Sequence, residues 1–480
     1  MPTTVGIQTM EYRVDNTLLD NTTIGNLNTS YQYNNYGEQT FESVDLNESN
    51  LFNVTYTRDD LGRIESKVVN TPSYSHKYGY TYTPFGHLET ETVNGITTTY
   101  IYDDNGNRLT RSVGSDVEQG VVDEQDRLMS YGDCTYTYSL NGELATKTCA
   151  QIQTVYSYDV MGNLLEVEIT DTSTQESNII RYGVDAQDRR IAKYVDGVKA
   201  YGLLYSDQLS PIAMLDGDNN VTATFIYGTR VNVPDYMVKD GISYKFITDQ
   251  LGSPLMVVDT ATGNIAQQLT YDAFGRVLSD SNPGFQPFGF AGGLYDKETG
   301  LVRFGARDYD AYAGRWTNKD PIRFASGDLN IYGYANSDPV NLVDINGMEA
   351  CSCSKVIGAP SRQHLQGHSY MKVIQPPMSA EQARIRVKAD RNTAQNVTYV
   401  SLGLSAAAVA TKNQTLAYAS LATGGGAAAL LGLTPDHKQG DYMNNELFID
   451  WSTGGTHHHT WGVLEGDEFD SGWQNSCSEN

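Results

Sequence analysis

Two aspartates about two thirds of the way along the chain have the residue type and spacing for peptide-bond chemistry. Asp320 begins the run Asp320-Pro-Ile-Arg323, and Asp344 begins the run Asp344-Ile-Asn-Gly347. Two carboxyl groups beside one peptide bond can hydrolyse it, because one activates water while the other, kept protonated, polarises the carbonyl. Asp-Pro and Asn-Gly pairs are also ordinary turn formers, and the residues alone favour that interpretation. Asp328 and Asp338 lie in the same segment and are weaker candidates.

The segment 349–480 contains a second set of reactive side chains. It holds six of the eight histidines and three of the five cysteines. A cysteine beside a histidine can act as a nucleophile, and the same groups can bind zinc. The spacing matches no standard zinc motif and no nucleophile elbow, so surface histidines and free thiols are the simplest interpretation. The candidates are Cys353, Cys477, His364, His368 and His457.

An uncharged stretch lies between these groups. From residue 392 to residue 435 the only charged side chain is Lys412, and Ala, Gly, Ser and Leu dominate. Small residues let helices pack closely, so the stretch is predicted to be a helical hairpin, either inserted in a membrane or buried in a soluble domain. Segments 367–374 and 457–464 are predicted to be strands. We therefore expect a small α+β or α-rich C-terminal domain.

A tyrosine-rich repeat fills most of residues 1–348. Its copies include Tyr80-Thr-Tyr82-Thr-Pro-Phe-Gly86, Tyr100-Ile-Tyr102-Asp103-Asp-Asn-Gly106 and Tyr156-Ser-Tyr158-Asp159-Val-Met-Gly162. Weaker copies carry aspartate in the glycine position, at Asp126 and Asp188.

Each repeat is predicted to be a β-hairpin. The Tyr-x-Tyr alternation has a period of two, so both rings face the same side of a strand. The Asp-x-x-Gly run supplies the turn, because aspartate bonds its own backbone and glycine accepts positive φ. One hairpin cannot bury its face alone, so stacked neighbours must supply the core. The predicted fold class is therefore mainly β.

Charge and cysteine content exclude several classes of protein. The chain has 33 basic and 58 acidic side chains, a net charge of −25, which argues against a general nucleic-acid binder. Residues 1–348 hold 24 of the basic and 46 of the acidic groups, whereas residues 349–480 hold 9 and 12. Five scattered cysteines are too few for a disulfide framework. The N-terminus lacks the pattern of a signal peptide, so we expect export by another route.

The Tyr-x-Tyr-Asp-x-x-Gly-Arg-Leu pattern resembles the YD repeat of Rhs proteins, the bacterial relatives of the C component of Tc toxin complexes. The runs Phe290-Ala-Gly-Gly-Leu-Tyr-Asp296, Gly300-Leu-Val-Arg-Phe-Gly-Ala-Arg-Asp-Tyr309 and Gly314-Arg-Trp316 resemble the Rhs-associated core. The resemblance covers roughly residues 30–348. It implies a cocoon-like spiral of β-hairpins, forming part or all of an Rhs shell, closed at one end by the core-associated segment.

The resemblance also implies a division of the chain and a self-cleavage site. Residues 1–280 are expected to form the repeat shell, residues 281–348 the core plug and residues 349–480 a variable effector domain. Asp320 and Asp344 are expected to cut the chain near Met348–Glu349. The sequence departs from the family pattern in three places: Arg323 stands where glycine is usual, Ile345 where proline is usual, and Met348 where leucine is usual.

The function implied by the resemblance is that of a polymorphic toxin in bacterial competition or host attack. The shell would enclose and release the effector, and no cofactor or metal is expected. Expected partners are the chain's own C-terminal domain, an immunity protein, and a type VI secretion spike (VgrG–PAAR) or a Tc toxin component. A membrane is one candidate target, and nucleic acid is not favoured. The alternatives are a hydrolase effector, Cys/His or metal-dependent, and a non-toxic structural or binding repeat protein. Because the chain begins inside the repeat array, we expect a fragment, an orphan or a separately encoded toxin component.

Overall fold

The computed structural model describes residues 8–13, 18–326 and 328–350, together with the strands at 369–374, 442–449, 456–464, 467–470 and 474–475. The described residues up to 350 belong to one compact unit, and the later strands belong to another. Each unit is described by itself.

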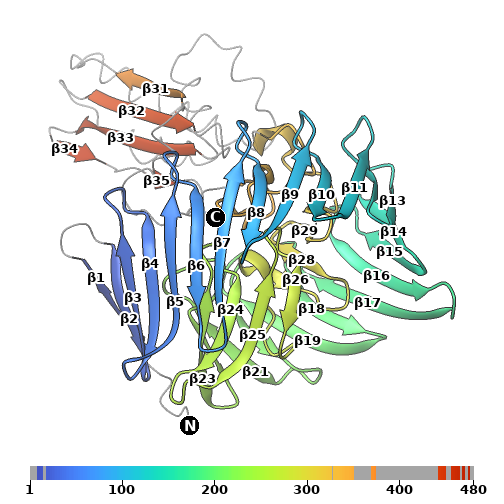
Figure 1. Ribbon diagram of the computed structural model, residues 1–480, viewed down its shortest axis with the longest axis horizontal. Coiled ribbons are helices and arrows are strands. Elements are labelled where there is room, and N and C mark those ends of the chain that lie inside the picture. Colours follow the sequence, from blue (N-terminus) through green and yellow to red (C-terminus); the bar gives the residue numbers. More distant parts are fainter. Residues whose placement is uncertain are drawn as a thin grey trace. The chain divides into compact units, whose positions relative to one another are not determined.

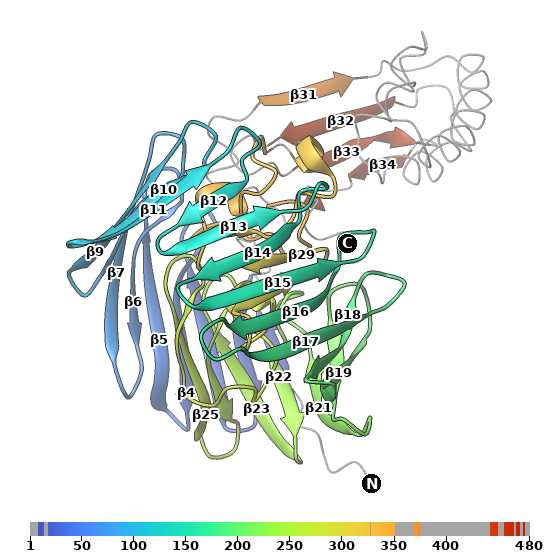
Figure 2. The ribbon, with the colours of Figure 1, turned by 90° about the vertical axis from the view of Figure 1, so that its right-hand side faces the viewer.

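Within the first unit, the described residues include one continuous antiparallel sheet of 26 strands (Figures 1 and 2). Each strand pairs with the next strand in the sequence, as β4 pairs with β5 and β15 with β16. This order follows from a chain of successive hairpins, because antiparallel neighbours can be joined by a direct connection without a crossover. The first thirteen strands are β1 Thr9–Tyr12, β2 Leu19–Ile24, β3 Leu27–Tyr33, β4 Gln39–Leu46, β5 Ser49–Arg58, β6 Ile64–Asn70, β7 Ser75–Tyr82, β8 Leu88–Val93, β9 Ile96–Tyr102, β10 Arg108–Val113, β11 Asp116–Val122, β12 Leu128–Tyr131 and β13 Cys134–Tyr138. The others are β14 Leu144–Cys149, β15 Ile152–Tyr158, β16 Leu164–Asp171, β17 Glu176–Val184, β18 Arg190–Val195, β19 Val198–Tyr205, β20 Pro211–Leu215, β21 Val221–Ile226, β22 Tyr236–Lys239, β23 Ile242–Thr248, β24 Pro254–Asp259, β25 Ile265–Tyr271 and β26 Val277–Asp280.

The predicted turns have the expected local chemistry. Asp59 Oδ1 accepts the backbone N–H groups of Leu61 at 3.0 Å and Arg63 at 2.9 Å, and Gly62 between them has φ +84°. Other repeats contain the same bonds. In the weaker copies, Asp126 (φ 60°) and Asp188 (φ 61°) adopt the left-handed conformation of the missing glycine. The hairpin prediction is confirmed, including these substituted turns.

The two tyrosines of each repeat have different tasks. The first is buried in the core, as Tyr80 and Tyr100 are, at 6% and 2% exposure. In several repeats the hydroxyl of the second donates to a carbonyl at the start of the return strand of the preceding hairpin, whereas Tyr138 accepts the backbone N–H of Leu128 instead. Tyr82 bonds Ile64 O at 2.6 Å, and Tyr102 bonds the equivalent carbonyl at 2.8 Å. The Tyr-x-Tyr pattern therefore joins neighbouring repeats as well as filling the core.

The sheet curls until strands from its two ends meet. The backbone N–H of Asn26, in the β2–β3 turn, donates to Thr260 O at 2.9 Å, and its side chain donates to Ala261 O at 2.9 Å. Both acceptors lie in the turn between β24 and β25. One buried core cluster draws on both ends, since Phe52 and Tyr80 share it with Tyr236 and Met256. Figure 2 shows the curvature of the strands.

A plug segment, residues 281–348, packs against the concave face of this sheet. Its aromatic core includes Phe290, Tyr309 and Trp316, each no more than 2% exposed. Four short strands pair in order, and three 3-10 turns accompany them. These elements are η1 Phe290–Gly292, β27 Leu294–Tyr295, β28 Leu301–Phe304, β29 Arg307–Asp310, β30 Arg315–Trp316, η2 Arg323–Ser326 and η3 Ala335–Ser337.

The plug bonds directly to the turns of the repeats. Its side chains donate to carbonyls of turn glycines in three hairpins of the shell, which ties the segment to the turns. The bonds are Ser337 to Gly106 O at 2.9 Å, Tyr332 to Gly142 O at 2.7 Å and Asn318 to Gly162 O at 3.2 Å.

A disulfide joins Cys134 and Cys149, which face each other across the β13–β14 hairpin. The five cysteines predict no disulfide framework, and their spacing does not predict this single bond, because spacing alone does not give strand register.

The described part of the second unit is a five-stranded antiparallel sheet. The segments predicted as strands at 367–374 and 457–464 are confirmed as β31 Ser369–Ile374 and β33 Thr456–Leu464. The other strands are β32 Tyr442–Ile449, β34 Asp467–Asp470 and β35 Gln474–Asn475. The predicted helical hairpin at 392–435 lies outside the described residues.

Candidate functional site

Asp344 binds the backbone on which the predicted cleavage falls. Its side chain is buried, and its Oδ1 accepts the N–H groups of Met348 at 3.0 Å and Glu349 at 3.2 Å. Asn346 Oδ1 accepts the same two groups at 2.9 Å and 3.2 Å. Gly347 makes this turn possible, because it has φ +70° and a Cβ there would lie 2.9 Å from the backbone nitrogen of Arg307.

Arg307 brings Asp320 to the same place. One atom of its guanidinium, Nη2, lies 3.0 Å from Asp320 Oδ2 and 3.0 Å from Asp344 Oδ2. The two carboxylate oxygens are therefore at most 6.0 Å apart (3.0 + 3.0). Arg307 Nε also donates to Gly347 O, and the guanidinium lies 4.2 Å from the centre of the Trp316 ring. The arginine thus fixes both carboxylates and the chain segment before the predicted break.

Burial and the shared cation set the protonation of these groups. Burial raises the pKa of Asp320 to about 6, against the opposing charge of Arg307. Burial also raises the pKa of Asp344, again opposed by Arg307 and by backbone N–H donors. Burial raises the pKa of Glu349 to about 7, and the charges of Asp344 and Asp320 add to the effect. Burial thus raises the pKa of all three carboxyl groups, while Arg307 opposes the shift of the two aspartates, so an acid and a base can coexist at this turn.

The turn-former interpretation of the two aspartates also holds in the structure. Asp320 Oδ1 accepts the N–H of Ile322 at 2.9 Å, and the backbone N–H of Arg323 donates to Asp320 O at 3.0 Å. Arg323 has φ 53°, a conformation that glycine adopts without strain. Arg323 therefore holds a backbone conformation that suits the glycine usual at this position.

Asp328 and Asp338, the two weaker candidates, form the following hydrogen bonds, which go to residues other than those at the predicted break. Asp328 Oδ1 accepts the N–H of Asn330 at 2.8 Å, and burial raises its pKa to about 6. Asp338 holds the side chain of Asn341 at 2.9 Å, and Asn341 in turn donates to Tyr82 of the shell at 2.9 Å. Asp338 therefore helps to fasten the plug.

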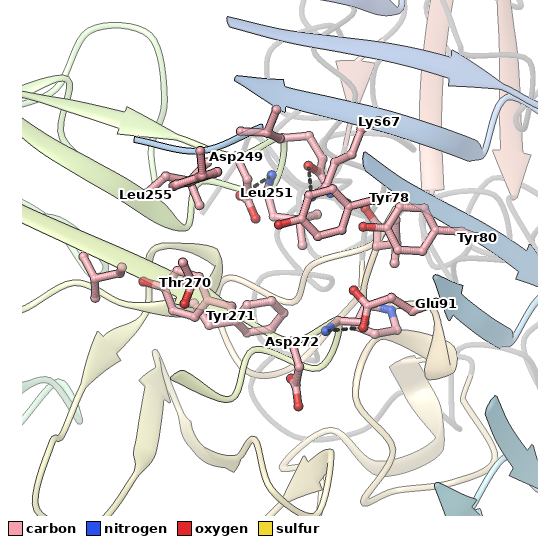
Figure 3. A pocket seen from close by; sticks show the side chains of 18 residues that line it. Lys67, Tyr78, Tyr80, Glu91, Asp249, Leu251, Leu255, Thr270, Tyr271 and Asp272 are labelled. Atoms are coloured by element: carbon pink, nitrogen blue, oxygen red, sulfur yellow. Dashed lines mark hydrogen bonds between the residues drawn. The ribbon is translucent and has the colours of Figure 1, made fainter. Parts of the chain in front are cut away.

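A separate cavity of about 50 Å³ lies between the shell and the plug (Figure 3). Lys67, Tyr78, Tyr80, Glu91 and Asp249 are among its lining residues. It is large enough for a few waters and too small for an organic substrate. The sequence gives no signal for these residues, because an acidic residue in a strand is usually solvated.

The predicted effector residues have no described side-chain geometry. His364, His368, Cys353 and Cys477 lie outside the described residues. His457 is in β33, where its backbone pairs with Phe448 on one side and Asn475 on the other.

No cluster of three or more metal-ligating side chains occurs in the described parts of the chain. None of the helices among the described residues combines the length and apolar character needed to cross a bilayer.

Comparison with known proteins identifies the family. The Teneurin YD-shell family model matches residues 4–340, which is more than half of the chain, so the chain belongs to this family of YD-repeat shell proteins. Teneurin-3 of Danio rerio is 28% identical over 312 residues and Teneurin-4 of Homo sapiens 27% over 321, covering 61% and 64% of this chain. The tRNA3(Ser)-specific nuclease WapA of Bacillus spizizenii is 27% identical over 264 residues, or 53% of this chain. The chain spans 11% of the length of each of these relatives.

Solved structures with a similar fold include the crystal structure of TcdB2-TccC3-Cdc42, with a TM-score of 0.52 and 15% identity over 71% of this chain and 19% of the other. The crystal structure of TcdB2-TccC3-TEV has a TM-score of 0.50, 15% identity and the same coverage. At this identity the likeness concerns the fold alone. The predicted YD-repeat family is confirmed, and so is a mainly β shell that resembles those of Tc toxins.

Proposed function

We propose that the chain is the shell and release device of a polymorphic toxin, which cuts itself between Met348 and Glu349. The observation that carries the proposal is the position of Asp344, whose carboxylate accepts the N–H of the bond to be broken while Arg307 holds Asp320 beside it. Family membership supports the shell, and the likeness to TcdB2-TccC3 supports its fold.

The proposed reaction is hydrolysis by a carboxyl pair. Asp320 takes a proton from a water molecule, and the water oxygen bonds to the carbonyl carbon of Met348. Asp344, which is protonated when the reaction begins and lies 3.2 Å from the nitrogen of Glu349, gives that proton to the nitrogen as the C–N bond breaks. Arg307 acts as a positioning residue, because it holds both carboxylates and the carbonyl of Gly347. Water is the only other reactant.

Self-cleavage is tested by expressing the full chain and sequencing the new N-terminus. We expect pieces of roughly 38 and 14 kDa, estimated from residue counts, and a new N-terminus at Glu349. Asp344→Asn and Asp320→Asn should leave the chain intact. Asp338→Asn is the matched control, because it alters another buried aspartate of the plug whose pKa burial also raises, to about 7, and it should cleave normally. An intact wild type, or cleavage that persists in Asp344→Asn, contradicts the proposal.

The released segment, 349–480, is proposed to be the effector. Growth arrest on inducing it in the bacterial cytoplasm or periplasm supports a toxin, and harmlessness in both supports the alternative of a structural or binding repeat protein. Depolarisation of the inner membrane favours the hypothesis that residues 392–435 insert in a membrane. A loss of tRNA favours a nuclease. The name of the WapA relative is the reason for this assay, although the net negative charge of the segment argues against nucleic-acid binding.

The partners and the route of export are also proposals. An immunity protein should restore growth when it is produced together with the effector. Delivery by a type VI secretion spike or a Tc component predicts that the chain leaves its cell only when that apparatus is present.

A further inference from the structure

Asn346 holds the same two backbone N–H groups as Asp344, at the bond that the proposed function breaks. Its Oδ1 accepts the N–H of Met348 at 2.9 Å and that of Glu349 at 3.2 Å. Asp344 Oδ1 accepts the same groups at 3.0 Å and 3.2 Å. The bond to Met348 closes an ordinary turn two residues along the chain, whereas the bond to Glu349 reaches the nitrogen of the scissile peptide. Each N–H group therefore has one ionisable and one neutral acceptor.

The neutral acceptor matters because Asp344 changes its protonation during the proposed reaction. Its Oδ2 accepts a hydrogen bond from Arg307 Nη2 at 3.0 Å, and a proton on Oδ2 would compete with that donor. The acidic proton therefore belongs on Oδ1, which lies beside the nitrogen of Glu349. An Oδ1 that carries a proton is a poorer acceptor for the two N–H groups, whereas the amide oxygen of Asn346 does not titrate.

The scissile nitrogen also needs an acceptor for its own hydrogen while it receives the proton. The nitrogen of a planar peptide has no free lone pair, and one develops only when water has bonded to the carbonyl carbon. Asp344 can protonate that lone pair only if the N–H of Glu349 no longer points at Asp344 Oδ1. Asn346 Oδ1, 3.2 Å from the same nitrogen, is the acceptor to which the N–H can turn.

The backbone of this turn is held in place without the side chain of Asn346. The N–H of Ala306 donates to Asn346 O at 2.9 Å, and Arg307 Nε donates to Gly347 O. The turn between β28 and β29 also packs closely against it, because a Cβ at Gly305 would collide with Asn346 O. Removing the amide should therefore alter the hydrogen bonds of the scissile peptide and not the path of the chain.

We propose that Asn346 is a positioning residue of self-cleavage, whose amide oxygen takes over the scissile N–H while Asp344 delivers a proton to the nitrogen. This inference rests on the proposed function, because it assigns a role within that reaction. No covalent bond forms or breaks at Asn346, so the hydrolysis needs no further reactant. Asn346 should control the rate of cleavage and leave its position unchanged.

The test follows cleavage of the full chain made by cell-free translation, with samples moved to buffers between pH 5 and pH 8. We expect Asn346→Ala to be cleaved roughly tenfold more slowly than wild type at the same bond, the effect of losing about one hydrogen bond in the transition state. Asn346→Asp keeps an oxygen acceptor and should restore cleavage at its own pH optimum. Its added negative charge raises the pKa of Asp344 and Asp320, so the pH profile should move to higher pH.

Asn341→Ala is the matched control, because Asn341 is another partly buried asparagine of the plug whose bonds go to the shell. It should be cleaved at the wild-type rate. Thermal unfolding in the uncut Asp320→Asn background should give equal melting temperatures with and without Asn346→Ala.

Four results, each with a wild type that cleaves, would overturn the inference and leave the proposed function standing. They are an unchanged rate in Asn346→Ala, no recovery in Asn346→Asp, equal slowing in Asn341→Ala, and a melting temperature clearly lowered by Asn346→Ala. A wild type that stays intact overturns the proposed function and this inference together.

Discussion

Replacing Glu91 by glutamine should stabilise the shell at neutral pH and change little in acid. Glu91 lies on β8, is 5% exposed and accepts the N–H of Ala273 at 3.3 Å. Burial raises its pKa to about 7, the charge of Asp272 adds to this, and Lys67 opposes it. Figure 3 shows its carboxyl group among the charged and phenolic side chains of the small cavity. The folded shell therefore holds a carboxyl group that resists ionisation.

The magnitude follows from the difference between the folded and unfolded pKa. In the unfolded chain Glu91 has its ordinary pKa of 4.5, so between pH 4.5 and 7 the folded state binds more protons than the unfolded state. The free energy of unfolding therefore falls as the pH rises through this window. Each pKa unit corresponds to about 1.4 kcal/mol, so the loss by pH 8 is on the order of 3 kcal/mol. Glutamine keeps the acceptor oxygen and does not ionise, so Glu91→Gln should avoid this loss.

The assay compares thermal unfolding of wild type and Glu91→Gln at pH 5 and pH 8. We expect similar melting temperatures at pH 5 and a clearly higher one for the variant at pH 8. Glu89→Gln is the control, because Glu89 is exposed on the same strand. Its replacement should leave the melting temperature unchanged at both pH values. Two results would refute the reasoning. One is a difference in melting temperature between wild type and Glu91→Gln that is the same at pH 5 and pH 8. The other is a wild type whose melting temperature rises relative to that of the variant as the pH rises.

Three further predictions concern the repeats. Gly142→Ala should loosen the plug, because the new Cβ would lie 2.6 Å from the hydroxyl of Tyr332. Gly86→Ala is the control, because Gly86 has a similar φ and no neighbouring atom within 4 Å of the added Cβ. Limited proteolysis should cut the plug faster in Gly142→Ala than in Gly86→Ala. Tyr102→Phe should lower the free energy of unfolding by about 1 kcal/mol, measured in urea, because it removes one bond between hairpins. Reduction of the Cys134–Cys149 bond should lower it by about 3 kcal/mol, given the separation of 15 residues, and reductant should not affect Cys134→Ser/Cys149→Ser.

The repeat and its hairpins could be predicted because their chemistry is local. Asp59 bonds the backbone two and four residues later, so a short run of sequence contains both partners. The Tyr-x-Tyr period fixes which face is buried without knowledge of the neighbours. Even the substituted turns at Asp126 and Asp188 could be recognised, since aspartate tolerates positive φ better than most residues.

The candidate site could be predicted only in part. The sequence indicated Asp320 and Asp344 through their turn motifs and family resemblance. It gave no sign of Arg307, which lies 13 residues before one aspartate and 37 before the other and bonds both. An arginine in a strand is common and gives no signal by itself. Only the packing of β29 against the turns of Asp320 and Asp344 shows that Arg307 bonds both aspartates.

The sequence by itself determined the strands, the turns, the acidic character of residues 1–348 and the family, because each depends on residue type or on neighbours a few positions away. The tertiary structure alone decided how the sheet closes, with Asn26 bonded to Ala261 across 235 residues. It also decided that Glu91 is buried. These features depend on which strands meet in space. Which strands meet depends on the twist that accumulates from strand to strand along the whole sheet, and no single position in the sequence determines it.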